Sequence, residues 1–149
     1  MFPDGALPMS VSIQTDNAPK PVGRYPHARR VGELLFLSGI GPRSAVDNSI
    51  PGNVYASDGS LMAYDIAAQC HSVFANVRAV LESCGASWTD LVDVTVYLTH
   101  MSGDFKTYNA IWAEYFPDIA TAPCRTTLGI DSLPTPIAIE LKCVARLDQ

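Results

Sequence analysis

The chain has 149 residues, of which 48% are hydrophobic and 17% charged, and its formal net charge is −5. This length fits a single domain over residues 1–149 with a sizeable core. The acidic balance argues against a general binder of nucleic acid or anionic membranes, because the net field would repel phosphates.

Targeting and metal-binding signals are absent from the sequence. No segment has the pattern of a signal peptide or a membrane span, so a cytoplasmic protein is expected. The four cysteines lack C-x-x-C spacing and the three histidines are scattered. This favours free, mostly buried thiols over disulfides or a metal site.

The N-terminal part is expected to begin with a flexible tail over residues 1–10, followed by a strand over 11–15. The run Val-Ser-Ile-Gln-Thr has the period of a strand. A loop over 20–27 follows, with its path fixed by two prolines and a glycine. Loops often carry ligand-binding groups. The sequence of this loop is equally consistent with an ordinary solvated loop that binds no ligand. Three of its side chains suit contact with a ligand: Arg24, Tyr25 and His27.

A hairpin is predicted next, with strands over 27–31 and 34–38. The second strand is apolar on both faces, which is typical of a central strand. It ends in Gly-Ile-Gly-Pro-Arg43, where two glycines let the backbone approach a ligand and Arg43 stands at the strand exit. Residues 44–63 are polar and predict a long loop, which is either functional or mobile.

Two helices are predicted by apolar residues at helical spacing. The first follows Asp65 as its N-cap and ends at Gly85. The second begins at Asp104 or a neighbour, ends before Pro117, and carries Asn109 one step from its apolar stripe. Between the helices, residues 91–99 alternate as a strand with one polar face.

The last two predicted strands cover residues 124–130 and 137–143. We expect them to pair as a hairpin in which Ile130 faces Ile137, because that register aligns both apolar faces. An arginine beside a carboxylate and a hydroxyl could hold a carboxylate substrate and place a water, and a structural salt bridge explains the same grouping. The register gathers three polar side chains on the other face: Arg125, Thr127 and Glu140.

The element order β, ββ, α, β, α, ββ predicts an α+β fold in which two helices cover one face of a six-stranded sheet. The other face is too apolar to be left in water, and the mean hydropathy of +0.12 is high for a small soluble monomer. We therefore expect closed self-association through this face, with the predicted site at or beside the interface.

Six short motifs follow one another between residues 13 and 147: Gly23-x-Tyr25, Leu-Phe-Leu-Ser-Gly39, Asp-Val-Thr-Val-Tyr-Leu98, Tyr108-Asn109, Pro123-x-Arg125 and Ile139-Glu140. In these motifs and their order the sequence resembles the Rid/YjgF family of reactive-intermediate deaminases. Within that family it is most similar to the 2-aminomuconate deaminases, through Ser-Gly-Ile-Gly-Pro-Arg43 and Pro-Cys-Arg-Thr-Thr127.

The resemblance implies a chorismate-mutase-like fold, a homotrimer with three clefts between subunits, and no metal or organic cofactor. It also implies that Arg125 binds the substrate carboxylate and that Glu140 is associated with the water that attacks the imine. Tyr25 and Asn109 match other positions that line the cleft.

Two departures from the family pattern bear on the substrate. Thr127 stands where the broader imine-hydrolysing group often has cysteine, and Arg24 stands where that group has proline. They favour a longer, doubly anionic substrate whose second carboxylate meets Arg24, Arg43 or His27.

The sequence thus predicts hydrolytic deamination of 2-aminomuconate to the 2-oxo acid 4-oxalocrotonate and ammonia, in aromatic-compound degradation. Thr127 or nearby backbone amides would steady the tetrahedral centre. Two alternatives stay open: a broad 2-imino acid deaminase, and a non-catalytic trimer that binds small carboxylates. RNA cleavage is the least favoured reading, because no basic stripe is present.

Overall fold

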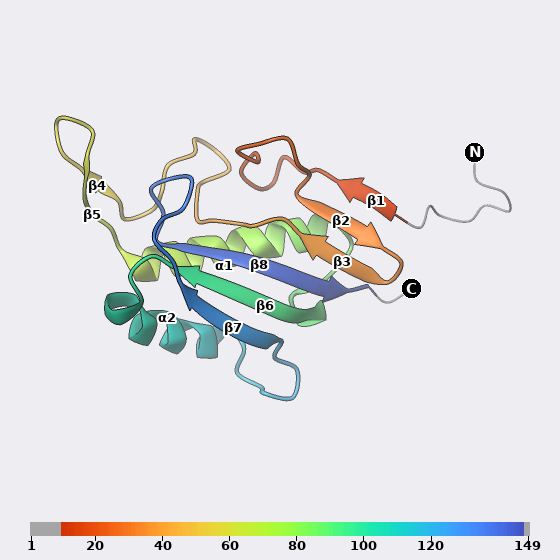
Figure 1. Ribbon diagram of the computed structural model, residues 1–149. Helices are drawn as coiled ribbons and strands as arrows, with labels where there is room; N and C mark the ends of the chain where they lie inside the picture. The colour runs from red at the N-terminus through yellow and green to blue at the C-terminus, as the bar shows by residue number, and fades with distance from the viewer. Residues whose placement is uncertain (1–9, 148–149) are drawn as a thin grey trace, which may run out of the picture.

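The computed structural model describes residues 10–147, so the predicted tail lies almost wholly outside the described residues (Figure 1). The helices are α1 (Ile66–Ser83) and α2 (Met101–Tyr115), with a short 3₁₀ turn, η2 (Trp88–Asp90), between them. The strands are β1 (Ser10–Ile13), β2 (Ala28–Val31), β3 (Leu34–Leu37), β4 (Val54–Tyr55), β5 (Leu61–Ala63), β6 (Leu91–Leu98), β7 (Cys124–Gly129) and β8 (Ile139–Arg146).

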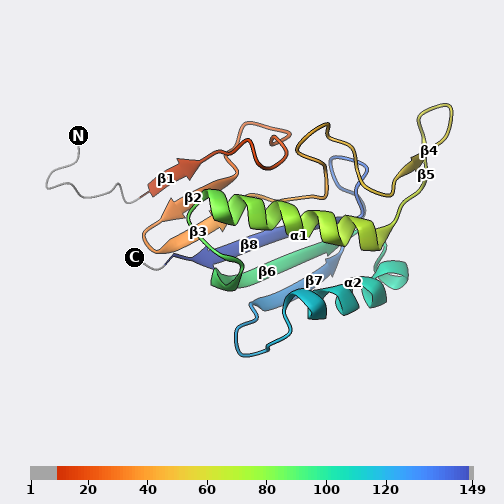
Figure 2. The same cartoon turned by 180° about the vertical axis from the view of Figure 1, so that it is seen from behind.

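Six strands form one mixed sheet in the order β1-β2-β3-β8-β6-β7. Neighbouring strands are antiparallel except for β6 and β7, which run parallel. Both helices lie on the same face of this sheet, which we call the covered face (Figures 1 and 2). The predicted α+β architecture, two helices on one side of six strands, is confirmed.

The predicted hairpin between the last two strands is wrong. β6 lies between β7 and β8, so that Val96 pairs with Thr127 on one side and with Leu141 on the other. Alternation does not determine which strand lies beside which. The alternation within β8 predicts its buried face, but that of β7 does not: Arg125 and Thr127 are level with buried Val94 and Val96. The residues predicted for the apolar face of β7 are exposed on the other side of the sheet: Cys124, Thr126 and Leu128. The chain leaves β7 at one edge of the sheet and returns as β8 in its interior.

This change of partner places Arg125 and Glu140 on opposite faces of the sheet. Arg125 is level with Val94 and Cys143, which are fully buried under the helices. Glu140 is level with Tyr97, on the face that no helix covers, which we call the open face. A single protomer therefore cannot bring the two groups together in one pocket.

The cap of α1 is confirmed, and that of α2 differs from the prediction. Asp65 accepts a hydrogen bond from the Ala68 backbone N–H at 3.1 Å, and Gly85 follows the helix with a φ of 78°. α2 instead begins at Met101, three residues before the predicted cap. Asp104 lies in the first turn of the helix and is buried, and its Oδ2 accepts a hydrogen bond from the Tyr64 hydroxyl at 2.6 Å.

The predicted long loop contains a hairpin, β4–β5, that projects from the body of the molecule (Figure 1). Its turn is built on Asp58, whose Oδ1 accepts the Ser60 N–H at 2.9 Å, and on Gly59, whose φ is 86°. An Asp-Gly pair between short extended runs is the sequence signal that could have found it. In the first part of the loop, Asn48 accepts a hydrogen bond from Arg43, which lines the site described below.

The open face carries several apolar side chains that are exposed in the single chain. Such a face is a candidate for contact with another copy, and the predicted trimer stays a prediction. None of the helices within residues 10–147 has the length and apolar character that crossing a membrane requires. The exposed apolar residues of the open face include Val31, Leu34, Phe36 and Leu128.

Candidate functional site

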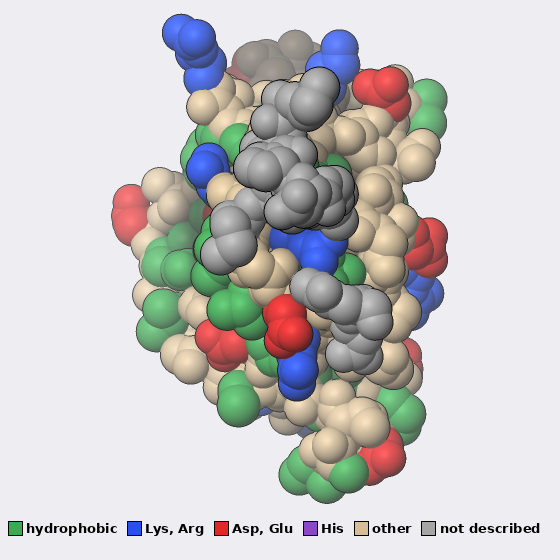
Figure 3. Space-filling view, turned by 90° about the vertical axis from the view of Figure 1, so that its right-hand side faces the viewer, with side chains coloured by type: hydrophobic (Ala, Val, Ile, Leu, Met, Phe, Trp, Pro, Cys, Tyr) green, Lys and Arg blue, Asp and Glu red, His purple; other side chains and the backbone are tan. Residues whose placement is uncertain are grey.

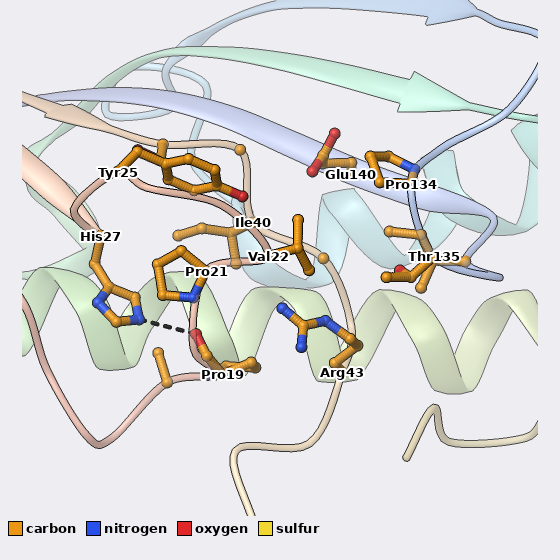
Figure 4. A pocket seen from close by; sticks show the side chains of 15 residues that line it. Pro19, Pro21, Val22, Tyr25, His27, Ile40, Arg43, Pro134, Thr135 and Glu140 are labelled. Carbon is orange, nitrogen blue, oxygen red and sulfur yellow. Dashed lines mark hydrogen bonds between the residues drawn. The ribbon is translucent and has the colours of Figure 1, made fainter. Parts of the chain in front are cut away.

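A cavity of about 70 Å³ lies between the loop before β2, the exit of β3 and the start of β8 (Figure 4). Four of the eight predicted site residues line this cavity, although they come from three separate parts of the chain. These four are Tyr25, His27, Arg43 and Glu140.

The Glu140 carboxylate is the acidic group of the cavity. Partial burial raises its pKa above the ordinary glutamate value. Within residues 10–147 the only salt bridge joins Arg146 to Glu33, so no cation of the described chain neutralises Glu140. A half-buried carboxylate without a cationic partner, and with a raised pKa, suits proton transfer from a water.

The segment after β3 is held in place by two side chains of α1. Ser72 Oγ donates to the Pro42 carbonyl at 2.7 Å. Asn76 Nδ2 donates to the carbonyls of Gly41 and Arg43, at 2.9 and 2.8 Å. The wall of the cavity that faces Glu140 is therefore fixed to the rigid helix, a role that the helical pattern of the sequence did not reveal.

Arg43 brings a positive charge to the same cavity. Its Nη1 donates to Asn48 Oδ1 at 2.9 Å and its Nη2 to the Lys20 carbonyl at 2.7 Å. Both acceptors are neutral oxygens, so they orient the guanidinium without cancelling its charge. Figure 4 shows Arg43 and Glu140 on two sides of Val22, pointing toward the space that these residues line.

His27 lines the cavity but has no ring nitrogen free for a ligand. Its Nδ1 accepts the Thr15 backbone N–H at 3.2 Å, so Nε2 carries the hydrogen and donates to the Pro19 carbonyl at 2.8 Å (Figure 4). These bonds give the ring a structural role in fixing the loop. Arg24 does not line this cavity but a neighbouring hollow, which shares Pro21, Tyr25 and His27 with it.

The other predicted site residues form a second group at the edge of the covered face. The Arg125 guanidinium carbon lies 5.1 Å from the ring centre of Tyr108 and 5.0 Å from that of Trp112. Its Nη1 is buried and has no hydrogen-bond partner among the described residues. Thr127 Oγ1 lies 2.7 Å from the Tyr108 hydroxyl, and Asn109 is exposed on α2 next to that tyrosine.

The structure thus contains two incomplete groups. One presents a carboxylate, a phenol and a cation in a cavity of about 70 Å³, which is well below the roughly 300 Å³ at the lower end of small-molecule sites. The other presents an arginine, a hydroxyl and an amide beside the edge strand β7. The carboxylate belongs to the first group, whereas the buried guanidinium without a hydrogen-bond partner among the described residues belongs to the second.

A family model described as Endoribonuclease L-PSP matches residues 15–147. The chain belongs to this family, the Rid/YjgF family. It is 36% identical over 137 residues to a RutC family protein of Pyrococcus horikoshii, with 92% of this chain and 98% of that protein covered. It is 30% identical over 138 residues to the 2-iminobutanoate/2-iminopropanoate deaminase of Escherichia coli K12, with coverage of 92% and 98%.

The fold agrees with that of solved Rid proteins. The crystal structure of the YjgF gene product of E. coli superposes on this chain with a TM-score of 0.77 at 28% identity, covering 91% of this chain and 98% of that one. The family resemblance inferred from the motifs is therefore confirmed.

Charge on the surface of this Rid-family chain does not form a basic stripe on the face shown in Figure 3. Lys and Arg side chains stand singly there among acidic and neutral ones. Binding of a phosphate backbone depends on several cations in line, each releasing counterions. This face, together with a net charge of −5, does not favour nucleic acid as the ligand.

No cluster of three His, Cys, Asp or Glu side chains suited to a metal ion occurs within residues 10–147. The cysteines of this Rid-family chain are free: Cys70 and Cys143 are buried, Cys84 is partly buried and Cys124 is exposed. Burial raises the pKa of the Cys70 and Cys143 thiols to about 12. Neither buried thiol is therefore a nucleophile at neutral pH.

Proposed function

We propose that this protein hydrolyses the C–N bond of 2-imino or 2-enamine acids, and that its preferred substrate is an unsaturated amino-dicarboxylate such as 2-aminomuconate. The observation that carries this proposal is the unpaired, partly buried carboxylate of Glu140 in a cavity that also holds the uncompensated charge of Arg43. The named activity of the E. coli relative on 2-iminobutanoate and 2-iminopropanoate supports the reaction class.

The complete site is assembled between protomers of a homotrimer, with Glu140 from one protomer and Arg125 from its neighbour. Their location on opposite faces of one sheet supports this arrangement, and so does the small volume of the cavity in one chain. Arg125 lies on β7, the last strand of the sheet, where a second copy can reach it. The exposed apolar residues of the open face supply a surface for association.

The reaction consumes one water and releases one ammonia. The enamine takes a proton on carbon to become the imine, water then adds at C2, and the C–N bond breaks as the protonated amine leaves. Glu140 takes the proton from the attacking water. Arg125 holds the C1 carboxylate through its guanidinium fork, and the Thr127 hydroxyl supports the tetrahedral centre.

Tyr25 is the candidate donor of the proton to carbon. Its hydroxyl belongs to the lining of the Glu140 cavity, whereas both ring nitrogens of His27 are engaged by the backbone. Asn109, exposed beside Tyr108 on α2, would contact the substrate from the Arg125 side. This scheme requires no metal and no organic cofactor.

Arg43 is the group best placed for the second carboxylate. Of the three side chains predicted to meet it, Arg24, His27 and Arg43, only Arg43 combines a position in the Glu140 cavity with a charge that no carboxylate compensates in the described chain. A broad 2-imino acid deaminase would need no such cation, so the relative rates on mono- and dicarboxylates separate the two versions of the proposal.

The first experiment measures ammonia release from enzymatically generated 2-aminomuconate and 2-iminopropanoate, by the wild type, Arg125→Ala and Glu140→Gln. The proposal expects turnover of 2-aminomuconate by the wild type and a large loss in both variants. Carboxylate binding without any ammonia release would instead identify a non-catalytic binding protein.

The second experiment tests the shared site by co-expressing Arg125→Ala with Glu140→Gln in equal amounts. Each protein alone should be almost inactive, whereas random trimers should regain about a quarter of wild-type activity, since one interface in four combines both native residues. A site contained in one protomer would give no recovery, and that result would reject the shared arrangement.

A further inference from the structure

We infer that Asn48 makes this site selective for dicarboxylates, by orienting Arg43 without neutralising it. This inference rests on the proposed function, because it assigns a determinant of substrate class to the same site. It gives a role to Asn48 within the loop over residues 44–63, whose role the sequence left open.

The geometry of the Arg43 head group is set by two acceptors from different loops. Asn48 Oδ1 takes one N–H from Nη1 at 2.9 Å, and the Lys20 carbonyl takes one from Nη2 at 2.7 Å. Without Asn48 a single hydrogen bond would remain, and a long arginine side chain would regain rotational freedom. The amide is therefore a positioning group that acts on substrate through Arg43.

Asn48 itself sits in a preformed turn. Its φ of 64° makes it the only non-glycine residue with a positive φ in the described part of the chain. The turn is closed by bonds from the Asn48 N–H to the Ser44 carbonyl at 3.0 Å and from the Ser44 N–H to the Ser49 carbonyl at 2.8 Å. Asparagine tolerates this left-handed conformation better than most residues, and aspartate shares that tolerance.

The neutral charge of the Asn48 amide is the second part of the inference. An aspartate at this position would accept the same hydrogen bond but would pair with the guanidinium and cancel its charge. The adjacent Asp47 does not do so: its Oδ1 accepts bonds from the Ser49 N–H and hydroxyl, at 3.0 and 2.6 Å, and it forms no salt bridge with Arg43. Within this turn the Asp47 carboxylate is thus hydrogen-bonded to Ser49 and does not pair with Arg43, whose charge stays available to bind an anion.

The test is the binding of two unreactive six-carbon dienoates, muconate with two carboxylates and sorbate with one, measured by calorimetry on the full-length protein. The wild type should bind muconate at least about tenfold more tightly than sorbate, as one additional charge-assisted contact predicts. Asn48→Asp should reduce this ratio about tenfold, through loss of muconate affinity, with sorbate affinity changed less than about twofold.

Two further variants separate orientation from charge. Asn48→Gly retains the positive φ and removes Oδ1, and should reduce the muconate preference less than Asn48→Asp, because the charge of Arg43 persists. Arg43→Gln removes the charge and should abolish the preference, which keeps the inference testable if Asn48→Asp does not fold. An unchanged ratio in Asn48→Asp, or in Arg43→Gln where the former is unfolded, overturns the inference.

The binding measurement is independent of turnover. If the protein releases no ammonia yet prefers muconate and loses that preference in Asn48→Asp, the deaminase proposal fails and the Asn48 inference stands. If ammonia is released but the ratio is the same in the wild type and Asn48→Asp, the inference fails and the deaminase proposal stands.

Discussion

Adding one methyl group at Gly39 should slow catalysis without disrupting the fold. A Cβ at this position would lie 2.9 Å from Glu140 Oε1 and 3.0 Å from its carboxyl carbon, whereas ordinary contact begins at 3.4 Å. Gly39 is not among the glycines with positive φ, so its backbone accepts alanine. The carboxylate, at the free end of a flexible side chain, must therefore retreat by about 0.5 Å to restore an ordinary contact.

This displacement sets the size of the expected effect. A misplacement of about 1 Å can cost about 10²-fold in rate, so about 0.5 Å corresponds to roughly tenfold in kcat for ammonia release. The melting temperature should change little, because two small effects oppose each other. Moving the carboxylate costs some stability, whereas alanine lowers the entropy of the unfolded chain and so stabilises the fold by about 0.4–1 kcal/mol where the backbone permits it.

Gly129→Ala is the matched control for this substitution. Its Cβ would meet Met101 at 3.6 Å, an ordinary contact, so both kcat and melting temperature should stay near the wild-type values. A Gly39→Ala protein that turns over the substrate at the wild-type rate would refute the reasoning, because Glu140 could then not be the base that acts on water.

Three other predictions concern the carboxylate, the arginine and the core. Glu140→Gln should lower kcat by about 10²-fold or more with a smaller change in KM. Burial raises the pKa of Glu140, so the kcat/KM of the wild type should rise with pH with an apparent pKa above that of an ordinary glutamate. The Gln variant should not show this rise. The pKa of Glu140 is higher in the folded than in the unfolded protein, so the wild type loses stability as the pH rises from the unfolded-state pKa to the folded-state pKa. Above the folded-state pKa, the Gln variant should therefore melt at a higher temperature than the wild type. Trp112→Leu removes one of the two rings beside Arg125 and should raise KM several-fold more than it lowers kcat, with Trp112→Phe restoring most of the loss. Tyr64→Phe removes the hydroxyl that binds the buried carboxylate of Asp104 and should cost about 1–3 kcal/mol in denaturant unfolding, against an unchanged KM.

The elements of the fold could be predicted wherever the signal was local. α1 has its cap residue, its apolar period and its terminal glycine within one continuous stretch, and the structure confirms all three. The start of α2 was misplaced because Asp104 looks like a cap residue in the sequence. Its carboxylate instead binds Tyr64, 40 residues earlier, and a contact at that separation leaves no local trace.

Strand order was the part of the fold that the sequence did not reveal. Adjacent strands most often pair with each other, and this preference led to the incorrect hairpin. A warning was present in the link between β7 and β8, which spans residues 130–138 and contains two prolines. Hairpin loops usually have about 2–5 residues, so a link of this length is typical of a connection that passes over a neighbouring strand. Here it passes over β6.

The chemistry of the site was easier to predict than its location. Arginine, glutamate and threonine on otherwise burial-prone strands stand out by residue type alone, and residue type persists whatever the strand order. Their common location depended on the hairpin, and the observed sheet separates them. The aromatic pair beside Arg125 was missed because Tyr108 and Trp112 fit the core stripe of a helix, and both are indeed buried.

The proposed site of Arg125 and Glu140 makes catalysis dependent on assembly, because the two residues lie on opposite faces of the sheet. Side chains on the two faces of one sheet point away from each other across the backbone layer, so the Arg125 and Glu140 of one protomer cannot hold the same substrate. In that site the Arg125 that acts with a given Glu140 belongs to another copy, and β7, an edge strand of the sheet, is where the two copies would meet. Substitutions of Val31 or Leu34, which lie on the open face level with Arg146 and not with Glu140, should consequently reduce ammonia release in step with dissociation measured by light scattering. Activity retained by a fully dissociated protomer would show that the substrate carboxylate is held by some group other than Arg125.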